Sequence, residues 1–172
     1  MHPSHASSAI AAEAAPTVLV LADIGFAIVS SLLEAHGLEL RQVADGEPIP
    51  GSYWGDSEAG LIATTVFVRA DTPVHSLLHE TAHLLVMPEA RRQTVHTDAS
   101  DSQAEEDAAC YLQILLADSL EGVGRDRLMS DMDAWGYTFR LGSARAWFES
   151  DSDDAREGLQ ALAPGLLERF GR

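Results

Sequence analysis

Residues 74–86 read VHSLLHETAHLLV, a largely apolar stretch with a proline on either side. Prolines in these places favour a helix that begins at the first and ends before the second, so we predict a helix over residues 73–86. With so few polar positions, this helix is expected to be buried on most sides. His79 and His83 are four residues apart. Their side chains therefore leave the same face of the helix, one turn apart.

The H-E-x-x-H spacing within this helix is typical of a zinc site. Two imidazoles one turn apart can each place a ring nitrogen at roughly 2.0–2.1 Å from one zinc ion. Glu80 lies about 100° around the helix from His79. Its carboxylate can therefore reach a water on the metal without being a ligand itself. The pattern predicts His79 and His83 as zinc ligands and Glu80 as the catalytic general base.

A catalytic zinc ion needs a third protein ligand, and the next predicted helix, residues 102–119, offers two adjacent glutamates. An apolar stripe of Ala108, Tyr111, Leu112 and Leu115 marks the inward face of this helix. Glu105 precedes Ala108 by three residues and therefore lies on the same face. Glu106 is rotated by about 100° from it. Ser102 and Glu105 also have the spacing of an N-terminal capping box, which is a competing role for this carboxylate. We predict Glu105 as the third ligand, with Glu106 and the cap as alternatives.

Other polar residues near the motif fit a ligand role less well. His75 precedes His83 by about 12 Å along the helix axis, too far to share a metal ion. Glu89 could reach the metal only if the chain turned back after the helix. Val86 stands where such a turn requires a glycine. His96 and Tyr137 are candidates for stabilising an oxyanion. An exposed loop histidine and a packing tyrosine are the alternatives for these two residues.

Apolar spacing and β-branched composition predict further elements on both sides of the two long helices. They are a helix at 22–36, strands at 38–44 and 60–68, a loop at 88–101, and short helices at 125–135, 143–149 and 154–170. We expect residues 1–16 to form a flexible tail and residues 17–172 to form a single α+β domain.

The composition is that of an acidic globular protein. It has 27 acidic residues against 11 basic ones, a net charge of −16 and no lysine. A surface of this sign repels phosphate groups, so we expect neither nucleic acid nor a membrane as a partner. No apolar run is long enough for a membrane span and no secretory leader is apparent, which favours a cytoplasmic protein. Cys110 is the single cysteine, which excludes an internal disulfide.

The two helical motifs together resemble a known family. A glutamate about twenty residues after H-E-x-x-H, on a second helix, resembles the gluzincin branch of zinc metallopeptidases. The second helix resembles the E-x-x-A-x-x-F-x-x-x-L-L signature of ImmA/IrrE-like peptidases, reading Glu105-x-x-Ala108-x-x-Tyr111-x-x-x-Leu115-Leu116. The resemblance covers residues 60–117 and selects Glu105. The chain departs from the family after this point, where Ala-Asp stands in place of a frequent Met-Pro.

The resemblance implies a zincin-like fold, with a small twisted sheet packed on the H-E-x-x-H helix and the second helix crossing it. It also implies a compact zinc metallopeptidase that cleaves a regulatory protein, since the known substrates of the family are transcriptional repressors. We expect a protein or peptide substrate to lie extended along the 60–68 strand, if that strand is an edge. The alternatives are a zincin-fold protein that binds metal and a partner without catalysis, and a zinc hydrolase of a non-peptide amide.

Overall fold

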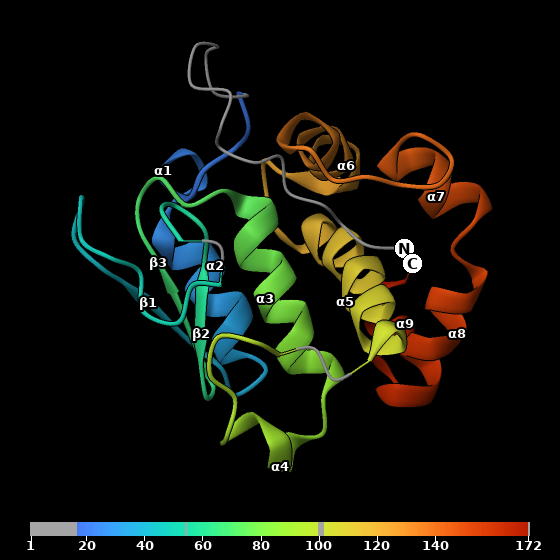
Figure 1. Cartoon of the computed structure of the whole chain (residues 1–172), viewed down its shortest axis with the longest axis horizontal. Helices are drawn as coiled ribbons and strands as arrows, with labels where there is room; N and C mark the ends of the chain where they lie inside the picture. Colours follow the sequence, from blue (N-terminus) through green and yellow to red (C-terminus); the bar gives the residue numbers. More distant parts are fainter. Residues whose placement is uncertain (1–16, 54, 100–101, 172) are drawn as a thin grey trace.

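A central helix, α3 (Val74–Val86), lies between a small sheet on one side and helix α5 (Gln103–Leu116) on the other (Figure 1). The computed structural model describes residues 17–53, 55–99 and 102–171. Every residue of α3 except Glu80 is buried, as its apolar composition on all sides requires. The chain has the predicted α+β architecture and is mostly helical.

The sheet has three strands, β1 (Glu39–Gln42), β2 (Gly60–Ile62) and β3 (Thr65–Val68), in the order β1-β3-β2. β1 pairs with β3 in parallel, and β2 pairs with β3 antiparallel. The prediction of one strand over residues 60–68 is therefore wrong, because this segment is a hairpin. The chain reverses at Ala63, whose φ of 52° is the left-handed conformation of a tight turn.

The outer edge of β2 is already paired by the protein's own chain. The Leu61 N–H donates to the Gly51 carbonyl oxygen at 3.1 Å, and the Thr97 N–H donates to the Leu61 carbonyl oxygen at 2.8 Å. The segment before β2 approaches so closely that a Cβ atom on Gly60 would overlap the Pro50 carbonyl. Two segments that are distant in sequence thus cover the side of β2 that faces away from β3.

Two helices precede the sheet, α1 (Leu21–Ile24) and α2 (Phe26–Glu34), and α2 packs against β1. The sequence predicts one helix over residues 22–36. Gly25 divides it, because its φ of 92° lies outside the helical region. The predicted loop at 88–101 contains the single turn α4 (Glu89–Arg92).

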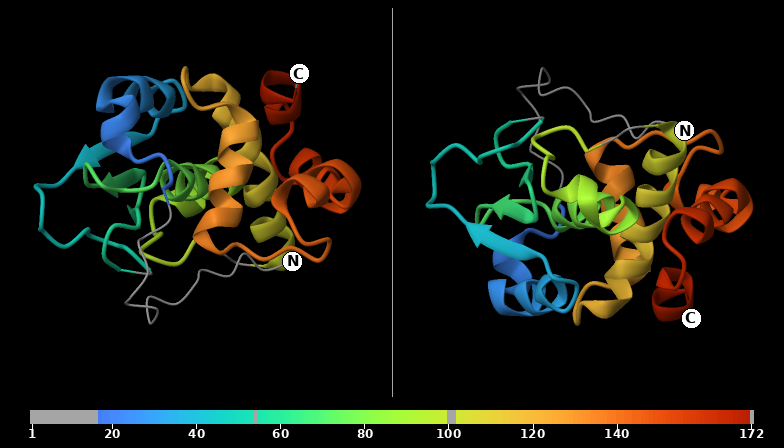
Figure 2. Two further views of the ribbon diagram at one scale, coloured as in Figure 1. Left: turned by 90° about the horizontal axis from the view of Figure 1, so that it is seen from above. Right: turned by 90° about the horizontal axis from the view of Figure 1, so that it is seen from below.

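The remaining helices follow α5 and pack around it (Figures 1 and 2). They are the 3-10 turn η1 (Ala117–Ser119), α6 (Gly124–Trp135), α7 (Ala144–Ser150), α8 (Asp153–Leu162) and α9 (Leu166–Phe170). The predicted helix at 154–170 is divided into α8 and α9, with Gly165 in the left-handed region. α5 packs against α3 and α8, so it is buried on more than one face.

None of the helices in the described part of the chain combines the length and the apolar composition needed to cross a bilayer. Cys110 is fully buried, as a small core residue would be. The expected flexible tail, residues 1–16, lies outside the described residues.

Candidate metal centre

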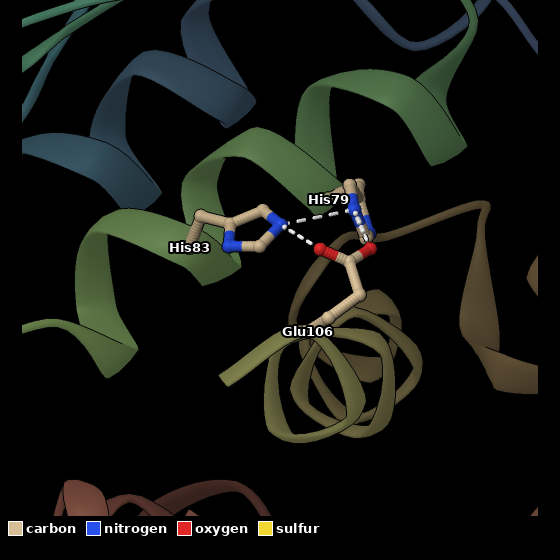
Figure 3. A group of neighbouring side chains, drawn as sticks. All are labelled: His79, His83 and Glu106. Carbon is tan, nitrogen blue, oxygen red and sulfur yellow. Dashed lines mark hydrogen bonds and ion pairs between the residues drawn. The ribbon is translucent and has the colours of Figure 1, made fainter. Parts of the chain in front are cut away.

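Two helices bring together His79 and His83 from α3 and Glu106 from α5 (Figure 3). The Nε2 atom of His79 lies 3.0 Å from Oε1 of Glu106, and the Nε2 atom of His83 lies 2.9 Å from Oε2. The two Nε2 atoms are 3.1 Å apart. One ligand atom from each residue lies within 4.8 Å of the others, so the three side chains can hold a metal ion.

The charges of this cluster are strongly coupled. Burial by itself would lower the pKa of His79, but the hydrogen bond and negative charge of Glu106 outweigh it and raise this pKa to about 9. Burial also works to raise the pKa of Glu106, yet hydrogen bonds from His79 and His83 hold it well below its ordinary value. A proton therefore binds between imidazole and carboxylate in the metal-free protein, at the place where a metal cation would bind.

Glu80 is the one residue of α3 that is not buried, and its charge interacts with the cluster. Desolvation raises the pKa of its carboxyl group, the nearby carboxylates of Glu106 and Glu58 raise it further, and the two histidines oppose this. A raised pKa is the direction that a general base near neutral pH requires. The role of Glu80 as the base stays a prediction.

The preference for Glu105 over Glu106 as the residue facing the histidines is wrong. The Arg91 guanidinium binds the Glu105 carboxylate through Nη2 to Oε1 at 2.6 Å and Nη1 to Oε2 at 3.1 Å. Ser102 Oγ accepts the Glu105 N–H at 3.2 Å, so the N-cap half of the predicted capping box is present. Glu105 therefore joins α5 to the segment that follows α3, and Glu106 is the glutamate that lies beside the two histidines.

The correction has a physical reason in the packing of α5. The bulky stripe that was expected to face α3 includes Tyr111, and this ring stacks on Phe148 of α7 at 4.9 Å between centroids. The side of α5 that carries Glu106 and Gln113 meets α3 instead. Ala109 and Cys110 are fully buried and follow Glu106 by three and four residues, on the same side of the helix. Glu106 therefore reaches both imidazoles from the side of α5 that lies away from Tyr111.

The other predicted residues lie outside the cluster. His75 is fully buried, and its Nδ1 atom is 3.2 Å from the Tyr137 hydroxyl. Glu89 is exposed at the start of α4, and His96 is exposed where it bridges to β2. The Tyr137 hydroxyl also lies 3.4 Å from Nε2 of Gln113, and its role as an oxyanion donor stays a prediction. The role proposed for His96 stays a prediction.

Two buried polar residues near the cluster were missed by the sequence analysis. Gln113 is fully buried and contacts His79, although it stands in the apolar run 111–116. Its spacing of seven residues from Glu106, two turns of helix, is the signal that could have found it. Glu58 is buried and accepts a hydrogen bond from Trp135 Nε1 at 2.7 Å.

The predicted docking of a substrate along the 60–68 strand meets an obstacle. β2 is an edge in the strand order. Its outward N–H and C=O groups at Leu61 already bind residues 51 and 97. An extended peptide could add to this edge only after these segments moved away.

Comparison of the chain with protein-family models, with curated protein sequences and with solved structures finds no match. What the protein does is therefore inferred from its residues and their geometry. The described residues include three side chains close enough to hold a metal ion, and the charge of Glu80 interacts with them.

Proposed function

We propose that the protein is a zinc-dependent hydrolase of the metallopeptidase class, with His79, His83 and Glu106 as metal ligands and Glu80 as general base. The observation that carries this proposal is the convergence of three ligand atoms within 4.8 Å, next to the glutamate of an H-E-x-x-H motif. Neither the i, i+4 histidine pair nor a glutamate on another helix would suffice alone, because each is common in helical proteins.

The donor set fits a catalytic zinc ion better than a structural one. Structural sites hold zinc with four protein ligands and use cysteine frequently, whereas catalytic sites use three and leave one position for water. Among the described residues, the cluster contains two imidazoles and one carboxylate. The histidines are 8% and 5% exposed, which keeps the ligands in a low-dielectric environment while the partly exposed Glu80 stays within reach of solvent.

A zinc ion bound here would polarise a substrate carbonyl and lower the pKa of a water toward neutrality. Glu80 accepts the proton of the attacking water and then delivers it to the leaving amine. The raised pKa of Glu80 favours the first step, since a carboxylate with a higher pKa takes a proton from water more readily.

A protein substrate is supported by the resemblance of residues 60–117 to ImmA/IrrE-like peptidases, which also suggests a zincin-like fold and a regulatory protein as the target. The glutamate that was aligned with the family signature, Glu105, is the partner of Arg91. The proposed ligand is the next residue, Glu106. Peptide-bond hydrolysis is therefore proposed on the ligand geometry first and on the resemblance second.

Glu80→Gln tests the proposal, because glutamine is nearly isosteric but cannot accept the proton. We expect the variant to bind one equivalent of zinc and to lose hydrolysis by about 10²–10⁴-fold, the usual loss when a general base is removed. Wild type and variant, loaded with zinc to the same extent, would be incubated with a proteome-derived peptide library and the products identified by mass spectrometry.

Cleavage at equal rates by the two proteins would show that Glu80 is not the base. A library left uncut by the zinc-loaded wild type would count against peptidase activity, and in favour of a protein that binds metal without catalysis. Cleavage by wild type alone supports the proposal.

A further inference from the structure

A buried amide lies directly behind the metal cluster. Gln113 of α5 is fully buried, and its Oε1 atom is 3.0 Å from Nδ1 of His79. Its Nε2 atom donates to the carbonyl oxygen of His75 at 2.7 Å and lies 3.4 Å from the Tyr137 hydroxyl. Gln113 thus joins α5 to two successive turns of α3.

The orientation of this amide is determined by its surroundings. A backbone carbonyl oxygen can only accept a hydrogen bond, so the group that faces His75 O must be the NH₂ of Gln113. The amide oxygen of Gln113 then faces His79, and it too can only accept. The proton of this hydrogen bond must therefore be on Nδ1 of His79.

We propose that Gln113 is a positioning residue of the metal centre: its amide keeps the His79 proton on Nδ1 and so presents Nε2 to the metal. This inference rests on the proposed function, because it concerns the same centre. The Nε2 atom of His79 is also the atom that faces Glu106, at 3.0 Å. A hydrogen bond to the second nitrogen of a metal-binding histidine fixes both its tautomer and the direction of its ring.

One face of α5 supplies both the ligand and this support. Glu106 and Gln113 are seven residues apart, so their side chains leave the helix on the same side, about two turns from each other. Glu106 faces the Nε2 side of His79, while Gln113 contacts its Nδ1 side. The imidazole is therefore held between two residues of one helix, and α5 fixes the ring and the third ligand as a unit.

Zinc affinity measured on substituted proteins tests the proposal. Gln113→Met keeps the length and volume of the side chain but removes the acceptor, and we expect zinc affinity to fall by about 10–100-fold, as is usual for lost partners of metal-binding histidines. Gln113→Glu restores an acceptor for Nδ1–H and should bind zinc more tightly than Gln113→Met. Thr81→Val is the matched control, since it removes another buried hydrogen bond of α3, from Thr81 Oγ1 to the Leu77 carbonyl at 2.7 Å.

Thr81→Val should leave both zinc affinity and the absorption spectrum of the cobalt(II)-substituted protein unchanged, and Gln113→Met should alter both. Gln113→Met with the affinity and cobalt spectrum of wild type would overturn the proposal. Equal losses in Gln113→Met and Gln113→Glu would overturn it as well, because the contact to Nδ1 would not be responsible.

Nuclear magnetic resonance of the wild type gives a readout that does not depend on the folding of any variant. In the zinc-free protein, we expect a slowly exchanging proton on Nδ1 of His79. On addition of cadmium-113, the coupling to this ring should appear at Nε2. Rapid exchange of the Nδ1 proton in the zinc-free protein, or coupling of cadmium to Nδ1, would overturn the role of Gln113. A wild type that binds neither metal refutes the proposed function, and the zinc-free Nδ1 proton still reports on the Gln113 contact.

Discussion

Substituting the two adjacent glutamates of α5 one at a time should separate metal binding from stability. Glu106→Gln removes the charge that faces Nε2 of both His79 and His83, at 3.0 and 2.9 Å. Glu105→Gln removes the charge that binds Arg91 at 2.6 Å. The two substitutions are chemically identical and affect neighbouring positions, so each is the control for the other.

The size of the effect at Glu106 follows from the energy of zinc sites. Binding free energies of about 10–16 kcal/mol in small zinc-binding peptides, divided over their four ligands, amount to about 2.5–4 kcal/mol for each ligand. Because about 1.4 kcal/mol is a factor of ten, Glu106→Gln should weaken zinc binding by about 60-fold to 700-fold. Glu105→Gln should change zinc affinity by less than about threefold, because its carboxylate is not in the cluster.

Glu105→Gln should lower the stability of the metal-free protein although it leaves zinc affinity nearly unchanged. The Arg91–Glu105 pair is partly buried, with side chains 28% and 9% exposed. Losing its charge-assisted bonds should cost about 1–3 kcal/mol. Zinc affinity would be measured by competition with a chromogenic chelator, and stability by urea unfolding in excess chelator. A loss of zinc affinity in Glu105→Gln as large as that in Glu106→Gln would refute the assignment of the third ligand.

Three other expectations concern pH and packing. The pKa of His79 in the metal-free protein is raised to about 9, so below that pH zinc must displace its proton. The logarithm of zinc affinity, measured by chelator competition, should therefore rise by about one unit per pH unit between pH 7 and 8.5. A flat profile would contradict this expectation. Trp135→Phe removes the indole N–H that donates to the buried Glu58 carboxylate at 2.7 Å. The free energy of unfolding in urea titrations should fall by about 1–3 kcal/mol, and an unchanged value would show that this bond does not contribute to stability. Gly60→Ala places a methyl group against the Pro50 carbonyl and should destabilise the protein by about 1–3 kcal/mol, whereas an unchanged melting temperature would show that the segment yields easily.

The parts of the site that depend on local sequence could be predicted. Residues 73–86 are apolar on all sides and bounded by prolines, so the helix and its burial follow from spacing alone. The relation between His79 and His83 is a property of helix geometry and needs no tertiary information. The same holds for α6 and α7, whose observed bounds lie within one residue of those expected.

The parts that depend on contacts between distant segments could not be predicted. α5 is buried on two faces, so its apolar stripe does not reveal which face meets α3. For that reason the sequence favours Glu105 over Glu106 as the third ligand. Arg91, which binds Glu105, lies in a segment that the sequence marks only as a loop. The reversal at Ala63 lacks the glycine or asparagine that normally signals a two-residue turn, so the sequence predicts one strand where the structure has a hairpin.

The covered edge of β2 also determines how the sheet meets other copies of the chain. An exposed strand edge is a template on which a second molecule can pair, and this is a common route to aggregation. Residues 51 and 97 already occupy the backbone groups of Leu61 on this side. The opposite edge, β1, carries Arg41 and Glu39 as an exposed ion pair at 2.7 Å, and charged side chains on an edge strand oppose such pairing. Both edges of the sheet are therefore protected from pairing with a second molecule, the β2 edge by segments of the same chain and the β1 edge by charged side chains.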